Sequence, residues 1–403
     1  MKTAQQEKTI SKRKRPSKAT FAIAAIAMIL SYQNCGEFAV DSSKLTQFAS
    51  LGSTGSAGAV LTPATDKYDA SCRTNPAYDA CVLLQNPIAR TGTQLSNVPA
   101  TRLDQLSAEA LYGVKLTSLN GNGKLENSTI SIDALKSAEV STTAASMKVA
   151  PAASGSSAFE QVNTYYWINR AAEYFDARSN GALPAKGKNI KVIVDDTITG
   201  FDFAKNTIRL KTSEAGSVAW SGDVAIHLFG VANLMHANPA GWTSLSAAKH
   251  STCNAVDKGC CTAAVGCANA IRFGVGEYFA ASMFPERTRI GEALVNTGNP
   301  QIISGVARDL ASLSTITATA TFTTATGYAQ ALGLIYASMW WEIRKTSGTQ
   351  SGEIDRIFLE HLSLLDGGDD FRTAIAKAKT VDARLFGGRH SGKFDTQSAA
   401  RGI

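Results

Sequence analysis

Cysteine and histidine, the side chains best suited to hold a metal or form crosslinks, gather most densely in one short stretch. His250 is followed by Cys253, Cys260, Cys261 and Cys267. Four thiolates could bind zinc, but the spacing C-x6-C-C-x5-C matches no common arrangement of zinc ligands. Two disulfides that close a loop are the alternative, and the spacing alone leaves the three possible pairings open.

The N-terminal sequence helps to decide between these two chemistries. A basic stretch, Lys12–Lys18, precedes an apolar run, Phe21–Leu30, and then Cys35. Ten apolar residues span about 15 Å as a helix, half of a bilayer core, so the pattern is typical of a secretory signal. The order resembles a bacterial lipoprotein signal, in which the cysteine is lipidated and becomes the first residue. An ordinary cleaved signal with an incidental cysteine is the alternative.

The lipoprotein resemblance implies a lipid-anchored protein of the cell envelope. Gly36 follows Cys35, and the aspartate associated with inner-membrane retention is absent, so we expect the outer membrane. Disulfides persist in such a compartment. Six cysteines remain besides Cys35, and we therefore expect Cys72 to pair with Cys81 and the four cysteines of 253–267 to pair among themselves.

The positive charge of the chain is concentrated in this N-terminal signal. The formal net charge is +7, and residues 1–34 contribute +6 of it, which leaves +1 for residues 35–403. No basic surface for nucleic acid is expected in the mature chain. The apolar content of 44% over 403 residues is enough for a sizeable core.

The local pattern changes from strand-like to helical along the chain. Residues 110–135 alternate in polarity around the Asn120–Gly123 turn signal, which predicts a β-hairpin. Short strands are expected at 190–194 and 207–210. Residues 159–175 show a helical period, and helices are expected to dominate beyond Asp223. Strands first and helices after favour an α+β fold.

These patterns divide the chain into five parts. The expected parts are a signal peptide at 1–34, a lipid-anchored flexible tether at 35–66, a strand-bearing region at 67–157, a mainly helical domain at 158–385 and a C-terminal tail at 386–403.

Four segments, in order, together resemble the gluzincin metallopeptidases of the thermolysin and fungalysin type. The helical segment 159–175 comes before the other three, which contain the positions of the family's chemistry. The first of these three is the run from Asp223 to Val231, where the family carries HExxH and this chain reads HLFGV. The second is Phe273–Ala281, similar to the family run that begins with a glutamate ligand. The third is Gln330–Trp341, similar to the fungalysin segment that begins with a histidine. The resemblance covers roughly residues 110–380 and implies a thermolysin-like body.

At most of the positions where the resemblance implies a zinc ligand or a catalytic group, this chain has a residue of another kind. His227 matches the first zinc ligand, but Leu228 stands at the general base and Val231 at the second ligand. Phe273 stands at the third ligand, and Gln330 at the histidine that stabilises the transition state. Leucine, valine and phenylalanine cannot coordinate zinc. We therefore expect the zinc cofactor and peptide hydrolysis to be lost.

Glu277 matches a family carboxylate that orients the first histidine ligand. The resemblance implies that Glu277 accepts a hydrogen bond from His227, an arrangement that can persist without zinc because it satisfies a buried polar group. The alternative is a dyad that serves another acid–base reaction.

The expected protein is thus an inactive gluzincin-like lipoprotein that binds a peptide or an envelope partner. An active zinc peptidase with a non-standard site and a purely structural envelope lipoprotein are the alternatives. A filled site would bring Leu228, Val231 and Phe273 into one apolar cluster, whereas a binding site would stay open.

Overall fold

A computed structural model describes ten stretches of the chain, all within the compact unit Gly52–Ile403. They are residues 67–68, 72–83, 111–143, 147–149, 157–213, 216–243, 266–283, 289–291, 308–311 and 325–403. These residues form a mixed α and β structure, which confirms the α+β class. No helix among them is both long and apolar enough to span a bilayer.

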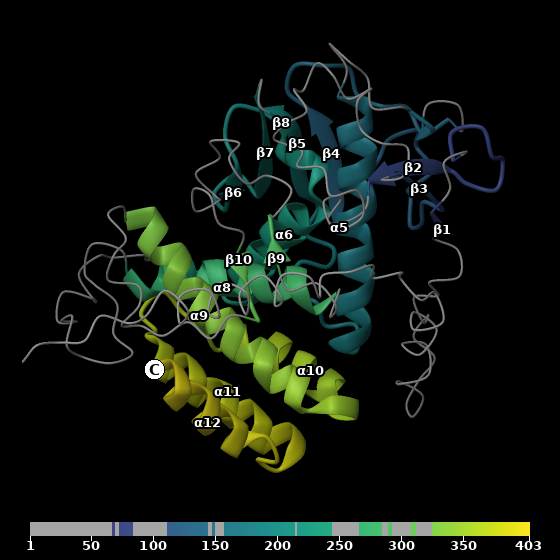
Figure 1. Cartoon of the computed structure of the whole chain (residues 1–403). Coiled ribbons are helices and arrows are strands. Elements are labelled where there is room, and N and C mark those ends of the chain that lie inside the picture. The colour runs from purple at the N-terminus through teal and green to yellow at the C-terminus, as the bar shows by residue number, and fades with distance from the viewer. Residues whose placement is uncertain are drawn as a thin grey trace, which may run out of the picture. The chain divides into compact units, whose positions relative to one another are not determined.

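The elements follow one another in this order (Figure 1). The strand-rich part contains β1 (Lys67–Tyr68), β2 (Ala80–Leu83), β3 (Leu111–Val114), β4 (Ile130–Ala134), α5 (Ala158–Arg178), β5 (Ile190–Asp196), β6 (Gly200–Asp202), β7 (Thr207–Ser213), β8 (Gly216–Ser217) and the 3-10 turn η6 (Val218–Trp220). The helical part contains α6 (Gly222–Ala237), α7 (Pro239–Thr243), α8 (Gly266–Ser282), β9 (Arg289–Ile290), β10 (Arg308–Asp309), α9 (Ala325–Thr346), η10 (Gly348–Gln350), α10 (Ser351–His361), α11 (Phe371–Phe386) and α12 (Ser391–Arg401).

The main sheet has the strand order β4-β5-β7-β6, with β8 paired to β7. β4, β5 and β7 are parallel, and β6 is antiparallel to β7. Ile190, Val192 and Val194 are buried while Lys191 is exposed, because side chains alternate between the two faces of a strand. The expected strands at 190–194 and 207–210 are confirmed as β5 and β7.

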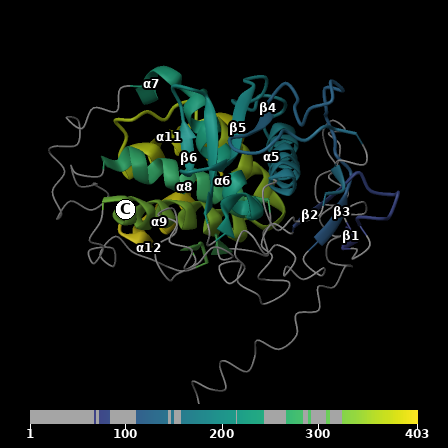
Figure 2. The same ribbon diagram turned by 90° about the horizontal axis from the view of Figure 1, so that it is seen from above.

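Helix α5 forms the connection between β4 and β5. Two parallel neighbours cannot be joined by a tight turn, so the chain crosses over through this helix and returns. The helix ends where Asn180 and Gly181 adopt left-handed backbone angles, with φ of 54° and 81°. Figure 2 shows α5 beside β4, and α6 between the strands and α8.

The hairpin predicted around Asn120–Gly123 is wrong. Gly121 and Gly123 do adopt positive φ angles and form a turn. However, β3 pairs with β1 and β2 in a separate small sheet, whereas β4 pairs with β5 in the main sheet. The turn signal is local, and the long-range partner of each strand decides the pairing.

The small sheet is covered by its own apolar cluster, distinct from the main core. This cluster consists of Cys72, Cys81, Leu83, Leu111, Phe159 and Trp220. Phe159 belongs to α5 and Trp220 to η6, so the cluster packs the small sheet against the start of α5. Asn163 of α5 reinforces the contact, because its side chain accepts from the backbone N–H of Leu83 at 2.9 Å and donates to the carbonyl of Ala219 at 2.7 Å.

The helices of the second half of the chain pack against one another, and α6 contacts the main sheet. α8 packs against α6 on one side and α9 on the other, and α10 and α12 pack against α9 (Figure 1). Helix α11 begins at the cap residue Asp370, whose carboxylate accepts from the N–H of Thr373 at 2.7 Å, and ends at the left-handed Gly387.

Two expected domain limits do not coincide with the packing. β4 comes from the region 67–157 but completes the sheet of the following domain. The segment 386–403, expected as a tail, contains α12, where Phe394 is fully buried. Arg401 also donates from Nε to Ser338 Oγ of α9 at 2.9 Å. Both segments are therefore parts of the folded body. The signal peptide and the whole tether, residues 1–66, lie outside the described residues.

Candidate functional site

The centre of the candidate site is a buried contact between α6 and α8. His227 lies near the middle of α6 and Glu277 in the second half of α8, and their side chains are 2% and 1% exposed. The imidazole Nδ1 is 3.3 Å from a carboxylate oxygen of Glu277. The prediction that these two helices pack side by side is confirmed. A carboxylate beside Nδ1 fixes the orientation of an imidazole ring.

Glycine makes this close approach possible. A Cβ atom on Gly276 would lie 2.6 Å from His227 Nδ1 and 2.7 Å from the His227 carbonyl oxygen. One turn later, a Cβ atom on Gly230 of α6 would lie 2.7 Å from the Phe279 ring of α8. The absence of two side chains therefore lets the helix backbones approach closely and brings the imidazole to the carboxylate.

The residues aligned with the family's zinc ligands and catalytic groups differ in how deeply they are buried. Leu228 and Val231 are 3% and 5% exposed and belong to the main apolar core. Phe273 is only partly buried, and its ring centroid is 6.1 Å from that of His227. Gln330 is buried on α9. Leu228 and Val231 are thus core residues, while Phe273 lies beside the histidine at the edge of that core.

The donor set around His227 does not fit a catalytic zinc ion. Such a site needs about three protein ligands, and the aligned positions offer one imidazole with the Glu277 carboxylate behind it. Leu228 also lacks any group that could take a proton from water. Among the described residues, no three His, Cys, Asp or Glu side chains are grouped to hold a metal. The loss of zinc remains a prediction that metal analysis has to test.

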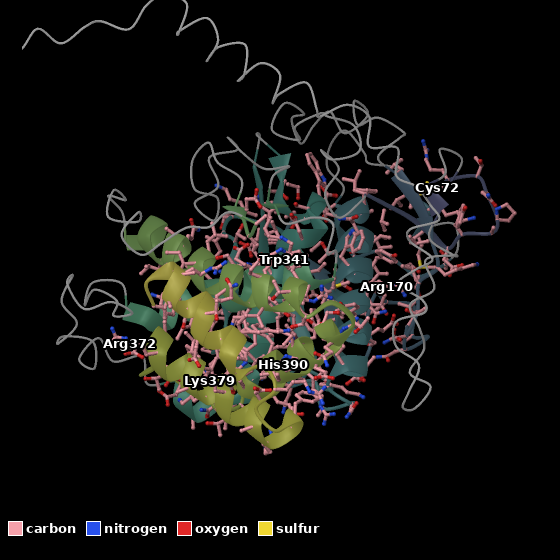
Figure 3. All side chains as sticks on the ribbon, turned by 60° about the horizontal axis from the view of Figure 1, so that its bottom comes forward. Cys72, Arg170, Trp341, Arg372, Lys379 and His390 are labelled. Atoms are coloured by element: carbon pink, nitrogen blue, oxygen red, sulfur yellow. A yellow bond between two sulfur atoms is a disulfide. The ribbon has the colours of Figure 1, made fainter. Side chains whose placement is uncertain are left out.

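The structure places only part of the predicted cysteine chemistry. Cys72 and Cys81 form a disulfide, with Cα atoms 5.8 Å apart, next to the small sheet (Figure 3). Cys35, Cys253, Cys260 and Cys261 lie outside the described residues. Cys267 belongs to the first turn of α8, and its side chain is not described.

Sequence reasoning missed a buried ion cluster centred on Asp355. Its carboxylate accepts from Arg344 Nε at 2.9 Å, Arg178 Nε at 3.0 Å and the Tyr278 hydroxyl at 2.7 Å. Burial would raise the pKa of Asp355, but Arg344 and Arg178 hold it below its usual value. The cluster joins α5, α8, α9 and α10 and leaves Asp355 fully paired, so its role is structural.

A second buried carboxylate lies at the start of α5. Glu160 accepts from the Trp220 indole N–H at 3.2 Å, and its other oxygen has no hydrogen-bond partner among the described residues. Burial raises the pKa of Glu160 to about 7. Neither Glu160 nor Asp355 is distinguishable in the sequence from a surface carboxylate on an amphipathic helix.

Comparison with known proteins gives no family assignment. No protein-family model matches the chain, and no curated protein matches it significantly.

Proposed function

We propose that this protein is an exported, lipid-anchored envelope protein that binds a peptide or an envelope partner and does not hydrolyse peptides. The observation that carries the proposal is the buried His227–Glu277 pair, held between two helices at 3.3 Å, with apolar residues at the aligned general base and the two other aligned zinc-ligand positions. A carboxylate this close to the imidazole supports the idea that Glu277 orients His227.

The chemistry of the surrounding residues supports binding over hydrolysis. Leu228 and Val231 are packed in the main core, where neither can act on water or on a metal. The imidazole is buried and lies beside Glu277 and Phe273. These neighbours suit a histidine–glutamate pair that stabilises the fold. A reaction at this histidine would need a general base or further ligands, and Leu228, Val231 and Phe273 at the aligned positions do not supply them.

The absence of peptidase chemistry is tested on the protein purified in detergent. Metal content is measured by mass spectrometry of the acid-digested protein, and hydrolysis is measured on a broad peptide mixture with and without chelator. We expect less than one zinc per ten chains and no chelator-sensitive cleavage. Stoichiometric zinc together with cleavage that chelator abolishes would show an active peptidase and reject the proposal.

The binding half of the proposal needs a separate measurement. Acetylated hexapeptide mixtures are incubated with the same protein, and retained peptides are identified after gel filtration. We expect retention that is reduced in a Phe273→Ala variant, because Phe273 is the partly exposed aromatic residue beside His227. A matched Phe203→Ala variant, changed in another partly buried ring, should retain peptides normally. No retention by any variant would favour the structural lipoprotein.

A further inference from the structure

Arg272 of α8 is a partly buried charged side chain for which the described residues provide no counter-charge. Its Nε is shielded from solvent and has no hydrogen-bond partner among the described residues. The only contact that the described residues give its guanidinium is Nη1 to Asn269 Oδ1, at a long 3.5 Å. Burial lowers the pKa of Arg272, and no carboxylate of the described residues offsets this effect.

Among the described residues, the shielded Nε of Arg272 is left without the partner that would replace its hydration. Removing a guanidinium from water is costly unless hydrogen bonds and an opposite charge replace its hydration. The two buried arginines of the described residues follow this rule, since Arg344 is paired with Asp355 and Arg401 donates to Ser338. Among the described residues, Arg272 does not follow this rule. A neutral residue at position 272 would avoid the cost of removing a charge from water.

Arg272 lies next to residues of the candidate site along α8. It precedes Phe273 directly, and it lies one helical turn before Gly276, the residue that contacts His227. Residues four apart lie on the same face of a helix, so Arg272 and Gly276 share one face of α8. Asn269 lies three residues earlier, which places the guanidinium over the first part of the helix, one turn away from the buried imidazole.

We propose that Arg272 binds a carboxylate of the peptide ligand at the α8 surface beside Phe273. This inference rests on the proposed peptide-binding function and names the group that is recognised. A planar guanidinium matches a carboxylate in shape and charge, and charge-assisted hydrogen bonds supply the partners that the described residues do not. The carboxylate is either the C-terminus of the peptide or an Asp or Glu side chain. The adjacent Phe273 provides an apolar contact for the rest of the peptide.

The test uses four acetylated hexapeptide mixtures and the full chain in detergent. The mixtures either contain or lack Asp and Glu, and each is made with a free or an amidated C-terminus. Affinity is measured by fluorescence anisotropy for the unchanged protein, Arg272→Gln and Arg272→Lys. Arg170→Gln is the matched control, because Arg170 is also partly buried but is paired with Glu173 at 3.4 Å (Figure 3).

We expect the mixture without any carboxylate to bind about 10-fold or more weakly than at least one mixture that has one. Arg272→Gln should abolish this difference, Arg272→Lys should reduce it, and Arg170→Gln should leave it intact. Whichever mixture binds identifies a terminal or a side-chain carboxylate. Peptide binding that is indifferent to carboxylates or to Arg272 would overturn the inference and leave the proposed function standing. No binding of any mixture would overturn both.

Thermal unfolding of the same variants separates ligand binding from a structural role. If Arg272 is kept for a ligand, Arg272→Gln should melt at or above the temperature of the unchanged protein, because it removes a partly buried charge that the described residues do not compensate. A melting temperature several degrees lower would show that Arg272 supports the fold and would reject the inference. Arg272→Lys, which keeps the charge, provides the folded comparison if Arg272→Gln is poorly produced.

Discussion

Glu160 illustrates at the scale of one residue how burial changes acid–base behaviour. Its carboxylate is enclosed by the start of α5 and by Trp220, and one of its oxygens has no hydrogen-bond partner among the described residues. Burial disfavours the charged form and raises the pKa to about 7, from an ordinary value of 4.5. Asp195 adds a smaller repulsion in the same direction. Protonation of Glu160 is therefore linked to folding at near-neutral pH.

The first prediction concerns the substitution Glu160→Gln. Between about pH 4.5 and 7 the unfolded chain has released this proton and the folded chain has kept it, so stability falls as the pH rises and levels off above 7. Gln is neutral throughout, so the variant should be more stable at pH 8 by about 1–3 kcal/mol and similar to the unchanged protein near pH 4. Urea unfolding at pH 4, 6 and 8 measures this. The exposed Glu139→Gln serves as control, and an equal pH dependence in both variants would contradict the prediction.

The second prediction restores the family's ligands at the candidate site. Leu228→Glu and Val231→His place polar groups in the core, and each should destabilise the metal-free protein by about 2 kcal/mol or more. Together with Phe273→Glu they complete a three-ligand set around His227. Added zinc should then raise the melting temperature of the triple variant only. A triple variant that zinc does not stabilise would show that the backbones of α6 and α8 do not hold the family geometry.

Single residues were predictable from sequence only where a pattern surrounds them. His227 and Glu277 were found because each sits in a run that resembles the family, and the structure places them 3.3 Å apart. Arg272, Glu160 and Asp355 gave no signal, because their importance lies in being buried. Burial of a charge depends on the tertiary neighbours, which the local sequence does not encode.

At the scale of elements, glycines set the distance between α6, α8 and α9. A Cβ atom on Gly333 of α9 would lie 2.7 Å from the Ala270 carbonyl oxygen and from Phe273 Cβ, both on α8. A Cβ atom on Gly274 would lie 2.7 Å from the Gly333 carbonyl oxygen. Together with Gly276 and Gly230, these residues make the helices approach backbone to backbone, which ordinary side chains would prevent.

The third prediction follows from these contacts. Alanine favours a helix over glycine by about 1 kcal/mol, yet Gly276→Ala and Gly333→Ala should each destabilise the protein, by about 1–3 kcal/mol net, because backbone atoms must move apart. Gly352→Ala in α10 is the matched control, since no atom lies within 4 Å of its added Cβ, and it should be neutral or slightly stabilising. Chemical denaturation of the three variants decides this. Stabilisation by Gly276→Ala would contradict the close packing.

Elements were predictable where the period of the sequence is unambiguous. The helix expected at 159–175 appears as α5 (Ala158–Arg178), and the strands at 190–194 and 207–210 appear with extended ends. The pairing of strands was not predictable, because residues 111–114 and 130–134 have the same alternating pattern but join different sheets. The local turn signal at Asn120–Gly123 carries no information on which sheet each strand joins.

At the scale of the whole molecule, the proposed anchor determines where the folded body works. The fourth prediction is that Cys35→Ser moves the protein from the membrane fraction to the soluble envelope fraction, because the proposed acylation at Cys35 is what would hold it on the bilayer. Cell fractionation and mass spectrometry of the mature N-terminus measure this. A double variant, Cys72→Ser with Cys81→Ser, keeps Cys35 and should stay with the membrane. An unmodified Cys35 in a soluble product would refute the anchor.

The crossover from β4 through α5 to β5 has a consequence for the order in which an exported chain can fold. A strand in a parallel pair gains its partner only after the whole connecting helix has been synthesised and translocated. If the chain is exported as proposed, β4 leaves the export channel before its partner β5, whereas the Cys72–Cys81 link spans only nine positions and needs no later residue to close. Oxidation of the small sheet can precede all folding of the body. The interval in which β4 lacks its partner is then the period when its free edge is most open to mispairing with other chains.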